Sequence, residues 1–381
     1  MAQSCNDGED QNDIVSTHSL MEETTETITS PPPLPTLPFD VLPEILCRLP
    51  VKLLGRLRCL CKFFNSLISD PKFARKHLHL STKRHHLMVK SRNNMGECVH
   101  CDYPITSIFS TSSVVTQTQL YAPGYNYALA LCSCDGIFCG TLKPGCYFLW
   151  NPSIRKFKLL PPLENPQRSF SFSVSFGYDH FIDNYKVIVV SSKNEVNVNT
   201  LGTDYWTTIE HIPYNYHILG PGIFVSGTVN WFAMDRSVSK HVLLSLDLEK
   251  LSSQNLWLPD LEHENYSWTL AVLRDCLCVF ASSGIYWDVW IMKEYGNKES
   301  WTKLYTIPNM QDRGLEAYSA LYISEDDQLL LVQCYELEDE REDDMKLVVY
   351  DSKTGTLNIP EFQNNYEQMY ANVYIESLIT P

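Results

Sequence analysis

The chain of 381 residues lacks a long apolar run and lacks positive charge at its start. No stretch of 18 residues is both apolar and uncharged, because the best window, residues 128–150, contains Asp135 and Lys143. Residues 1–30 hold seven acidic residues and no Lys or Arg, which is not the composition of a secretory signal. We therefore expect a soluble protein of the cytoplasm, the nucleus or both, with no membrane partner.

The short motifs of common catalytic and nucleotide-binding sites are also missing. The sequence contains no G-x-S-x-G, no G-x-x-x-x-G-K-S/T, no G-x-G-x-x-G and no H-E-x-x-H. Cys98 and Cys101 have the spacing of half a zinc site, but no matching second pair follows them. The 13 cysteines are odd in number and several sit in close pairs, which favours reduced thiols over a disulfide framework. We expect no cofactor and no bound metal.

The formal net charge of −15 argues against binding to nucleic acid, which is itself negatively charged. This net charge is the sum over three regions of different charge. Residues 1–38 carry −7, residues 39–93 carry +9 and residues 94–381 carry −17. The basic run Lys83–Arg92 lacks the aromatic side chains that a nucleic-acid site interleaves with positive charge. We interpret it as the first strand of a β region and expect no nucleic-acid partner.

The first two regions differ in their capacity to fold. Residues 1–36 are polar, acidic and rich in proline at their end, so we expect a disordered tail. From residue 42 to residue 49 the apolar spacing is that of one helix face, bounded by Pro38 and Pro50. Two more short helices are expected between Val51 and Ile68. Three short helices bury too little apolar surface to be stable alone, so this segment needs a partner.

The third region contains many apolar runs of four to eight residues bounded by turn residues, which predicts an all-β fold. Within it an apolar strand, a polar turn, a second strand and a proline recur. The closing prolines are Pro161, Pro213, Pro259, Pro308 and Pro360, separated by 52, 46, 49 and 52 residues. A period near 50 is the length of a propeller blade. Strands expected at residues 87–90, 105–109 and 373–378 would complete a sixth blade or close the ring.

The helical segment closely resembles an F-box over about 37 residues in order and spacing, from Leu37-Pro-Phe-Asp-Val-Leu-Pro-Glu-Ile-Leu-Cys-Arg-Leu-Pro to Arg58-Cys-Leu-Cys-Lys-Phe-Phe-Asn-Ser-Leu-Ile-Ser-Asp-Pro-Lys-Phe73. Phe64 stands where the plant pattern usually has Trp, and Gly55 where a larger residue is common. The resemblance implies docking onto a Skp1-like adaptor and, through it, onto cullin-1. The residues that match the family's adaptor-facing or motif-core positions are Leu37, Pro38, Leu42, Ile45, Leu46, Leu49, Pro50, Val51, Leu54, Cys61, Lys62 and Phe64.

The β region resembles the F-box-associated interaction domain of the plant F-box/kelch-repeat proteins. The matching segments are Ser133–Ile137, Leu149–Lys156, Phe176–Asp179 with Asn184–Val187, Val225–Trp231 and Tyr374–Leu378. The Gly-Gly doublet that kelch repeats carry in each blade is absent from the chain. The blade assignment therefore depends on period and strand pattern, and the family assignment on the quoted segments.

Together these observations predict a small all-α three-helix F-box followed by a large all-β kelch-like propeller of five or six blades. The expected boundaries are a tail at residues 1–36, the F-box at 37–80, a connector with the first strand at 81–100 and the propeller-like domain at 101–381. The resemblance implies a non-catalytic substrate receptor of a Skp1-cullin-F-box ubiquitin ligase. The alternatives are a Skp1-binding scaffold that drives no ubiquitylation and a propeller enzyme such as a glycosidase.

The target protein is unknown from sequence, and so is the surface that binds it. Tyrosine combines apolar area with a polar tip, which suits a protein-binding surface. The candidate target-binding residues are Tyr121, Tyr125, Tyr127, Tyr214 and Tyr216. Core packing explains these tyrosines equally well. We interpret the acidic run Glu336–Asp344 as a solvated loop, with recognition of a basic degron as the alternative.

Overall fold

The computed structural model describes residues 41–80, 84–110, 115, 118–120, 129–164, 173–209, 212–260, 267–283, 285–308, 316–334, 345–363 and 367–381. The chain divides into two compact units, residues 1–42 and residues 43–381. Of the first unit only Val41 and Leu42 are described, so the expected tail lies outside the described residues. All other described residues belong to the second unit.

In the described residues, four short helices precede the strands: α1 (Val41–Leu46), α2 (Val51–Leu57), α3 (Lys62–Ile68) and α4 (Pro71–Leu80). The sequence predicts three helices here, and α4 is an addition. Its first residue is Pro71, which is tolerated there because the missing N–H has no partner in a first turn. Asp70 caps the helix by accepting a hydrogen bond from the Lys72 N–H at 2.7 Å. Phe73 and His77, four residues apart, bury one face of α4.

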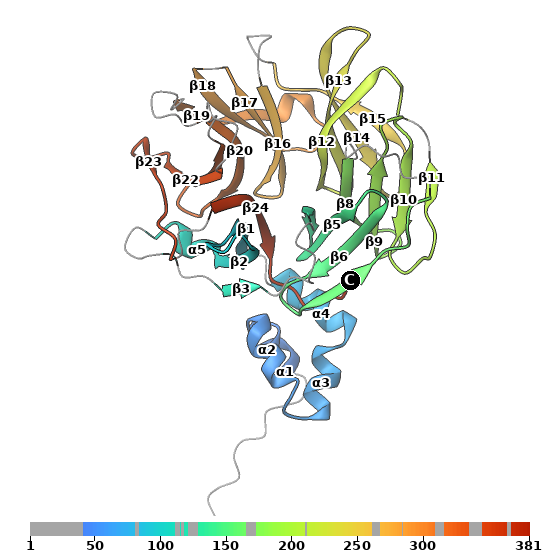
Figure 1. Cartoon of the computed structure of the whole chain (residues 1–381), viewed down its shortest axis with the longest axis vertical. Coiled ribbons are helices and arrows are strands. Elements are labelled where there is room, and N and C mark those ends of the chain that lie inside the picture. The colour runs from blue at the N-terminus through green and yellow to red at the C-terminus, as the bar shows by residue number, and fades with distance from the viewer. Residues whose placement is uncertain are drawn as a thin grey trace, which may run out of the picture. The chain divides into compact units, whose positions relative to one another are not determined.

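The strands form six four-stranded antiparallel sheets, which are the blades of a propeller (Figure 1). Each blade is given from its inner to its outer strand. Blade 1 is β24 (Glu367–Ile375), β1 (His85–Arg92), β2 (Cys98–Pro104) and β3 (Thr118–Leu120); blade 2 is β4 (Leu129–Cys134), β5 (Ile137–Lys143), β6 (Cys146–Asn151) and β7 (Lys156–Leu159); blade 3 is β8 (Ser173–Asp179), β9 (Asn184–Val190), β10 (Val196–Thr200) and β11 (Thr207–Ile209). Blade 4 is β12 (Tyr216–Val225), β13 (Thr228–Asp235), β14 (Lys240–Asp247) and β15 (Ser253–Leu256); blade 5 is β16 (Ser267–Leu273), β17 (Cys276–Ser282), β18 (Tyr286–Met292) and β19 (Trp301–Pro308); blade 6 is β20 (Glu316–Ile323), β21 (Gln328–Cys334), β22 (Met345–Asp351) and β23 (Thr356–Asn358). A small-helix-plus-propeller fold is therefore confirmed, with six blades.

The repeating motif of the sequence corresponds to the outer half of each blade. In blades 2 to 6 the predicted apolar strand is the third strand, β6, β10, β14, β18 or β22, and the closing proline ends or follows the fourth strand. Pro308, for example, is the last residue of β19. Proline fits this place because the outermost strand has an unpaired edge and needs no N–H there. The 50-residue period thus marks the blades by their outer edges.

Blade 1 closes the ring with strands from both ends of the propeller. The last strand, β24, pairs antiparallel with β1, placing Val373 opposite Leu87. After β24 the chain is held by Asn151, whose buried amide donates to the carbonyls of Ser377 at 3.1 Å and Ile379 at 2.8 Å. Asn151 and Ser377 lie in two of the sequence segments that resemble the family. These segments therefore serve ring closure.

One predicted strand is wrong. Residues 105–109 were expected to be extended, but Ile105–Ile108 form the short helix α5. Pro104 ends β2, and its carbonyl accepts a hydrogen bond from the Ser107 hydroxyl at 2.6 Å, which stabilises a turn. Ile105 and Ile108 are both buried, because a spacing of three places them on the same helix face. An apolar run of this length fits a strand or one helical turn equally well.

The core lies between neighbouring blades. One cluster joins β1 and β2 of blade 1 to β21 and β22 of blade 6, a second joins blades 5 and 6, and a third joins blades 3 and 4. Gly177 on β8 shows how tightly the blades approach, because a Cβ there would lie 2.3 Å from the Phe224 ring on β12. The inner strands therefore pack closely, and the side chains that they direct toward the propeller axis line a central channel.

Candidate functional site

The predicted adaptor-binding residues fall into four groups in the structure. Leu37 and Pro38 lie outside the described residues. Among the others, Leu46, Val51 and Leu54 are at most 4 % exposed, so they serve the packing of the helices themselves. The half-buried residues are Leu42, Leu49 and Phe64, and the exposed residues are Ile45, Pro50, Cys61 and Lys62. Only the last two groups offer side-chain surface to a partner.

Further apolar side chains of the same helices are exposed. Leu53, Leu60 and Phe63 are 38 %, 68 % and 44 % exposed, and Ile45 is 43 % exposed. The Phe63 ring stands edge-on to Phe64 at 5.7 Å between centroids. Exposed large apolar side chains are candidates for burial against a partner, because contact with water disfavours them. The predicted adaptor-binding residues do not include Leu53, Leu60 and Phe63, since periodicity cannot tell which of two apolar faces packs inside.

Basic residues accompany this apolar surface. Lys52, Arg56 and Lys62 are exposed on α2 and α3. Glu44, the acidic residue of α1, forms a salt bridge with Lys76 of α4. The helices therefore present mostly uncompensated positive charge, which favours an acidic partner.

The turn after α1 is joined to α4 and to Arg84, the residue before the first strand of the propeller. The Leu49 carbonyl accepts hydrogen bonds from Arg84 Nη1 at 2.6 Å and from His77 Nε2 at 2.9 Å. Arg84 also donates to the Arg48 carbonyl. Burial lowers the pKa of His77, so a neutral imidazole with its proton on Nε2 fits this hydrogen bond. A cation at a helix C-terminus is stabilising because it interacts favourably with the unpaired carbonyls.

A second contact joins α4 to blade 3. The Arg75 guanidinium pairs with the Asp183 carboxylate at 3.0 Å, donates to the Asp183 carbonyl at 3.0 Å and hydrogen-bonds to the Tyr178 hydroxyl. It also lies 4.9 Å from the centre of the Tyr178 ring. Tyr178 belongs to the Phe176–Asp179 segment, so the family resemblance was a signal for this residue but not for its role.

The candidate target-binding tyrosines are only partly described. Tyr121, Tyr125 and Tyr127 lie outside the described residues, as does the acidic run Glu336–Asp344. Tyr214 is 75 % exposed, whereas Tyr216 is half-buried and its hydroxyl accepts a hydrogen bond from Asn255 at 2.8 Å. Tyr214 is therefore accessible to a partner, and Tyr216 has a structural bond within blade 4.

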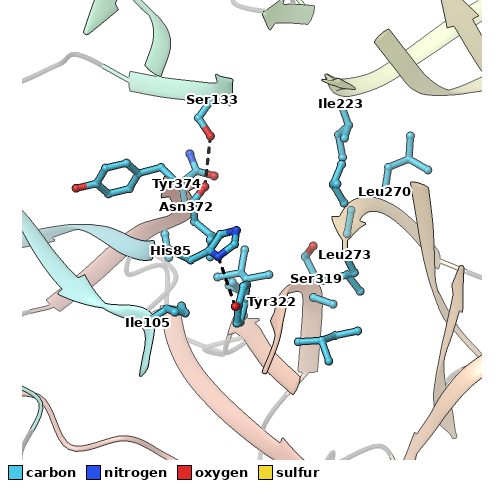
Figure 2. Close-up of a pocket in the computed structure, with 18 of the residues that line it drawn as sticks. His85, Ile105, Ser133, Ile223, Leu270, Leu273, Ser319, Tyr322, Asn372 and Tyr374 are labelled. Carbon is cyan, nitrogen blue, oxygen red and sulfur yellow. Dashed lines mark hydrogen bonds between the residues drawn. The ribbon is translucent and has the colours of Figure 1, made fainter. Parts of the chain in front are cut away.

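The central channel contains a cavity of about 1380 Å³. Strands β24, β4, β12, β16 and β20 line it, together with His85 and α5. Figure 2 shows Ile223, Leu270 and Leu273 on one side of this space and His85 and Tyr322 on another. Its charged lining residues are Asp135, Arg274, Asp275, Glu325 and Asp326. The cavity thus combines apolar walls with an excess of carboxylates.

Aromatic rings stand beside these carboxylates. The rings of His85 and Tyr322 are 4.9 Å apart, and those of Phe109 and Tyr322 are 6.1 Å apart. Burial lowers the pKa of His85, although the charge of Asp275 opposes this shift. Burial also raises the pKa of the Tyr322 hydroxyl, and the charge of Glu325 adds to that rise. Both rings are therefore uncharged near neutral pH, with carboxylates nearby.

A buried acid–base pair lies inside blade 1 and not in the cavity. His86 Nδ1 is 2.9 Å from Asp102 Oδ1, and the Tyr374 hydroxyl donates to the same oxygen at 3.0 Å. Burial alone would lower the pKa of His86, but the hydrogen bond and charge of Asp102, with the charge of Glu376, raise it. The side chains of His86 and Asp102 are only 15 % and 12 % exposed. This pair links β1, β2 and β24.

Within the described ranges, no group of three or more His, Cys, Asp or Glu side chains is arranged to hold a metal ion. In that same part of the chain, no helix combines the length and the apolar character needed to cross a membrane.

Two family models match the chain. The model described as the F-box associated beta propeller domain matches residues 91–381, and the F-box domain matches residues 34–76. The F-box/kelch-repeat protein At3g23880 of Arabidopsis thaliana is 29 % identical over 95 % of this chain and 99 % of its own length. The F-box protein CPR1 of the same plant is 27 % identical over 90 % of this chain and 89 % of its own. The similarity thus extends over both the helices and the propeller.

Among solved structures, a protein from Lactobacillus plantarum aligns with 76 % of this chain and 99 % of its own, at 12 % identity and a TM-score of 0.43.

Proposed function

The chain belongs to the F-box proteins that carry an F-box-associated β-propeller domain, and from this membership we propose that it is a substrate-recognition subunit of a Skp1-cullin-F-box ubiquitin ligase. In this proposal the helices α1 to α4 bind a Skp1-like adaptor, which connects the chain to cullin-1, and the propeller binds the target protein. The chain itself contributes no catalytic residue. It works in the cytoplasm, the nucleus or both, where the free cysteines of the described residues would stay reduced.

The observation that carries this proposal is the exposed apolar surface of the F-box helices. Four large apolar side chains between Ile45 and Phe63 remain accessible although the helices are short and have little internal core. Their burial against a partner would stabilise both the complex and the helices. The exposed basic side chains of the same helices add attraction to an acidic adaptor.

The mechanism is an increase in local concentration. A target held by the propeller is tethered to the ligase, so its lysines meet the ubiquitin-loaded enzyme as an intramolecular encounter. Contacts between the helices and the propeller matter for this geometry. Arg84 and Arg75 each join a helix to the propeller, which limits the orientations that a bound target can take relative to the adaptor.

The direct test is the affinity of the purified chain for a Skp1 adaptor before and after Ile45→Asp. Ile45 is exposed, so the charge should not unfold the helices, and a buried carboxylate in the interface should weaken binding at least about tenfold. Ile285→Asp is the matched control, because Ile285 is an exposed isoleucine of blade 5. Equal affinities of the wild type and Ile45→Asp would reject the adaptor surface.

Ubiquitin transfer separates a receptor from a scaffold. In a reconstituted ligase, a receptor should support transfer to a protein that the propeller binds, and transfer should disappear with Ile45→Asp. Adaptor binding without any transfer to a bound protein would instead favour the scaffold.

A further inference from the structure

The turn between β8 and β9 differs from the corresponding turns of the other blades. In blades 2, 4, 5 and 6 the turn between the first two strands contains only polar residues and glycine, at residues 135–136, 226–227, 274–275 and 324–327. In blade 3 it comprises residues 180–183 and includes Phe181 and Ile182, which are 76 % and 44 % exposed. Polar residues and glycine are usual in such turns because water surrounds them. The packing of blade 3 therefore does not account for this apolar pair.

The shape of this turn is fixed within the chain itself. Asp179, the last residue of β8, accepts hydrogen bonds from the N–H groups of Phe181 at 2.9 Å and Ile182 at 3.4 Å. At the other end of the turn, Asp183 has a left-handed backbone with a φ of 53°. Arg75 of α4 holds it through both its carboxylate and its carbonyl. A surface that is already ordered loses less conformational entropy when a partner binds.

The end of α4 lies beside this turn. Burial raises the pKa of Asp135, and the charges of Arg75, His79 and His180 oppose this rise. Arg75 and His79 belong to α4 and His180 to the turn, so both elements are close to the same carboxylate. His79 and His180 are exposed, although the His180 ring also packs edge-on against the Tyr178 ring at 4.9 Å between centroids. The end of α4 and the turn thus form one surface.

Neighbouring residues connect this surface with α1. Leu80, the last residue of α4, is 46 % exposed and lies one helical turn after Lys76. Lys76 forms a salt bridge with Glu44 of α1. Glu44 precedes Ile45, an exposed residue of the surface proposed for the adaptor. Exposed apolar side chains therefore continue from α1 over the end of α4 to the turn of blade 3.

The charges around the turn suit the same acidic partner as the other helices. Helix α4 contains three Lys or Arg residues and no acidic residue. The carboxylates of Asp179 and Asp183 are paired with Lys186 and Arg75. The half-buried Asp135 accepts a hydrogen bond from a tyrosine hydroxyl at 2.8 Å. In this described part of the chain, an acidic adaptor meets paired carboxylates and a basic helix, although the propeller as a whole is acidic.

We propose that Phe181 and Ile182 of blade 3, together with Leu80 of α4, form a second contact with the Skp1-like adaptor. This inference rests on the proposed function and extends the adaptor surface beyond the F-box, since the F-box model ends at residue 76. The adaptor then touches both the helices and the propeller. This double contact fixes the orientation of the propeller, and hence of a bound target, relative to the ligase.

The dissociation rate of the complex between the full chain and a Skp1 adaptor tests this contact. The double variant Phe181→Ser with Ile182→Ser should weaken binding about tenfold, mainly through faster dissociation, because apolar contacts are lost while the charges stay. Leu80→Ser should weaken binding severalfold. The matched control is Ile285→Ser with Tyr286→Ser, an exposed apolar pair of blade 5 between its second and third strands, at the opposite end of the sheet. Unchanged thermal unfolding of each variant excludes a folding defect.

A photo-crosslinker identifies what covers the turn. In the variant Phe181→p-benzoylphenylalanine, irradiation of the complex should join the chain to the adaptor. The same substitution at Tyr286, which is 49 % exposed, should give no such product. A crosslink from position 181 to a second copy of the chain, or to a target protein while the adaptor is bound, would overturn the proposal.

The kinetic results separate this contact from the proposed function. Equal dissociation rates of the wild type and the Phe181 and Ile182 double variant would reject the second contact, and so would an equal loss in the blade 5 control. If Ile45→Asp still weakens binding in that case, the adaptor surface of the helices stands. If the wild type binds no Skp1 adaptor, the proposed function fails and this contact fails with it.

Discussion

A buried ion pair of blade 3 is also hydrogen-bonded to blade 4. Lys186 Nζ lies 2.6 Å from Asp179 Oδ2 and donates to the Leu248 carbonyl at 2.6 Å. The two side chains are 8 % and 1 % exposed. Burial alone would raise the pKa of Asp179, but Lys186 and the N–H groups of Phe181 and Ile182 lower it below the ordinary range. The carboxylate therefore stays ionised, and its stabilising contribution is lost only in acid, as the pH falls through this lowered pKa.

Replacing the lysine of this pair should be costly. Lys186→Met leaves the Asp179 charge buried without its cation, so we expect the free energy of unfolding to fall by about 3 kcal/mol or more. Lys250→Met removes the cation of an exposed pair with Asp247 and should cost less than about 1 kcal/mol. Chemical denaturation of the two variants measures the difference. Equal small losses would mean that the buried pair contributes no more than a surface pair.

Lys186 and the F-box residues show how far the sequence predicts the partners and the burial of a single side chain. Phe176–Asp179 and Asn184–Val187 mark the family, yet the partner of Lys186 in blade 4 lies 62 residues away, beyond any local pattern. In the F-box, periodicity correctly places Leu46 and Ile45 on a helix, but the first is buried and the second exposed. Side-chain burial depends on tertiary contacts, which spacing alone does not contain.

At the level of elements, ring closure combines strands from two distant parts of the chain. In blade 1, β24 carries Tyr374, β1 carries His86 and β2 carries Asp102, and these side chains meet at the hydrogen bonds described above. The sequence predicts strands at both ends of the propeller and leaves open whether they close the ring. Pairing of β1 with β24 answers that question, because the pairing partner of a strand is set by the whole fold.

Because blade 1 contains His86, the free energy of unfolding should depend on pH. The pKa of His86 is raised in the folded protein, so its contribution is complete below the ordinary histidine pKa of about 6.5 and is lost as the pH rises through the raised value. We expect the free energy of unfolding to fall as the pH rises above about 6.5, and to fall less in His86→Gln. Chemical denaturation across this range is the measurement.

The control for this prediction is His217→Gln, since His217 is exposed on β12. It should keep the wild-type pH dependence. An identical slope in His86→Gln and the wild type would show that the pair with Asp102 does not change its protonation in this range.

The outer and inner strands of the blades differ in how well the sequence predicts them. The third and fourth strands repeat with a proline behind them, which makes their period visible. The inner strands follow segments of variable length, and α5 takes the place of a predicted strand because Pro104 ends the ladder and Ser107 closes a turn. The propeller was therefore predictable as a repeat, whereas its channel and cavity required the structure.

For the whole molecule, the net charge of −15 is the sum over regions of the chain that differ in charge and in proposed role. Residues 39–93 hold twelve Lys and Arg against three acidic residues, and they contain the exposed apolar surface proposed for the adaptor. The remaining propeller sequence is acidic, and its channel mouth keeps a negative excess. The basic segment that we propose for the adaptor and the acidic propeller sequence are thus separate parts of the chain.

The central claim is that one chain joins a ligase adaptor to a target and thereby shortens the target's lifetime. The most direct measurement is quantitative proximity labelling of the wild type and the Ile45→Asp variant in the same cells, with protein half-lives determined in parallel. We predict that Ile45→Asp loses Skp1 and cullin-1 from the labelled set while other labelled proteins increase and live longer. Unchanged labelling of Skp1, together with unchanged half-lives of every labelled protein, would contradict the account.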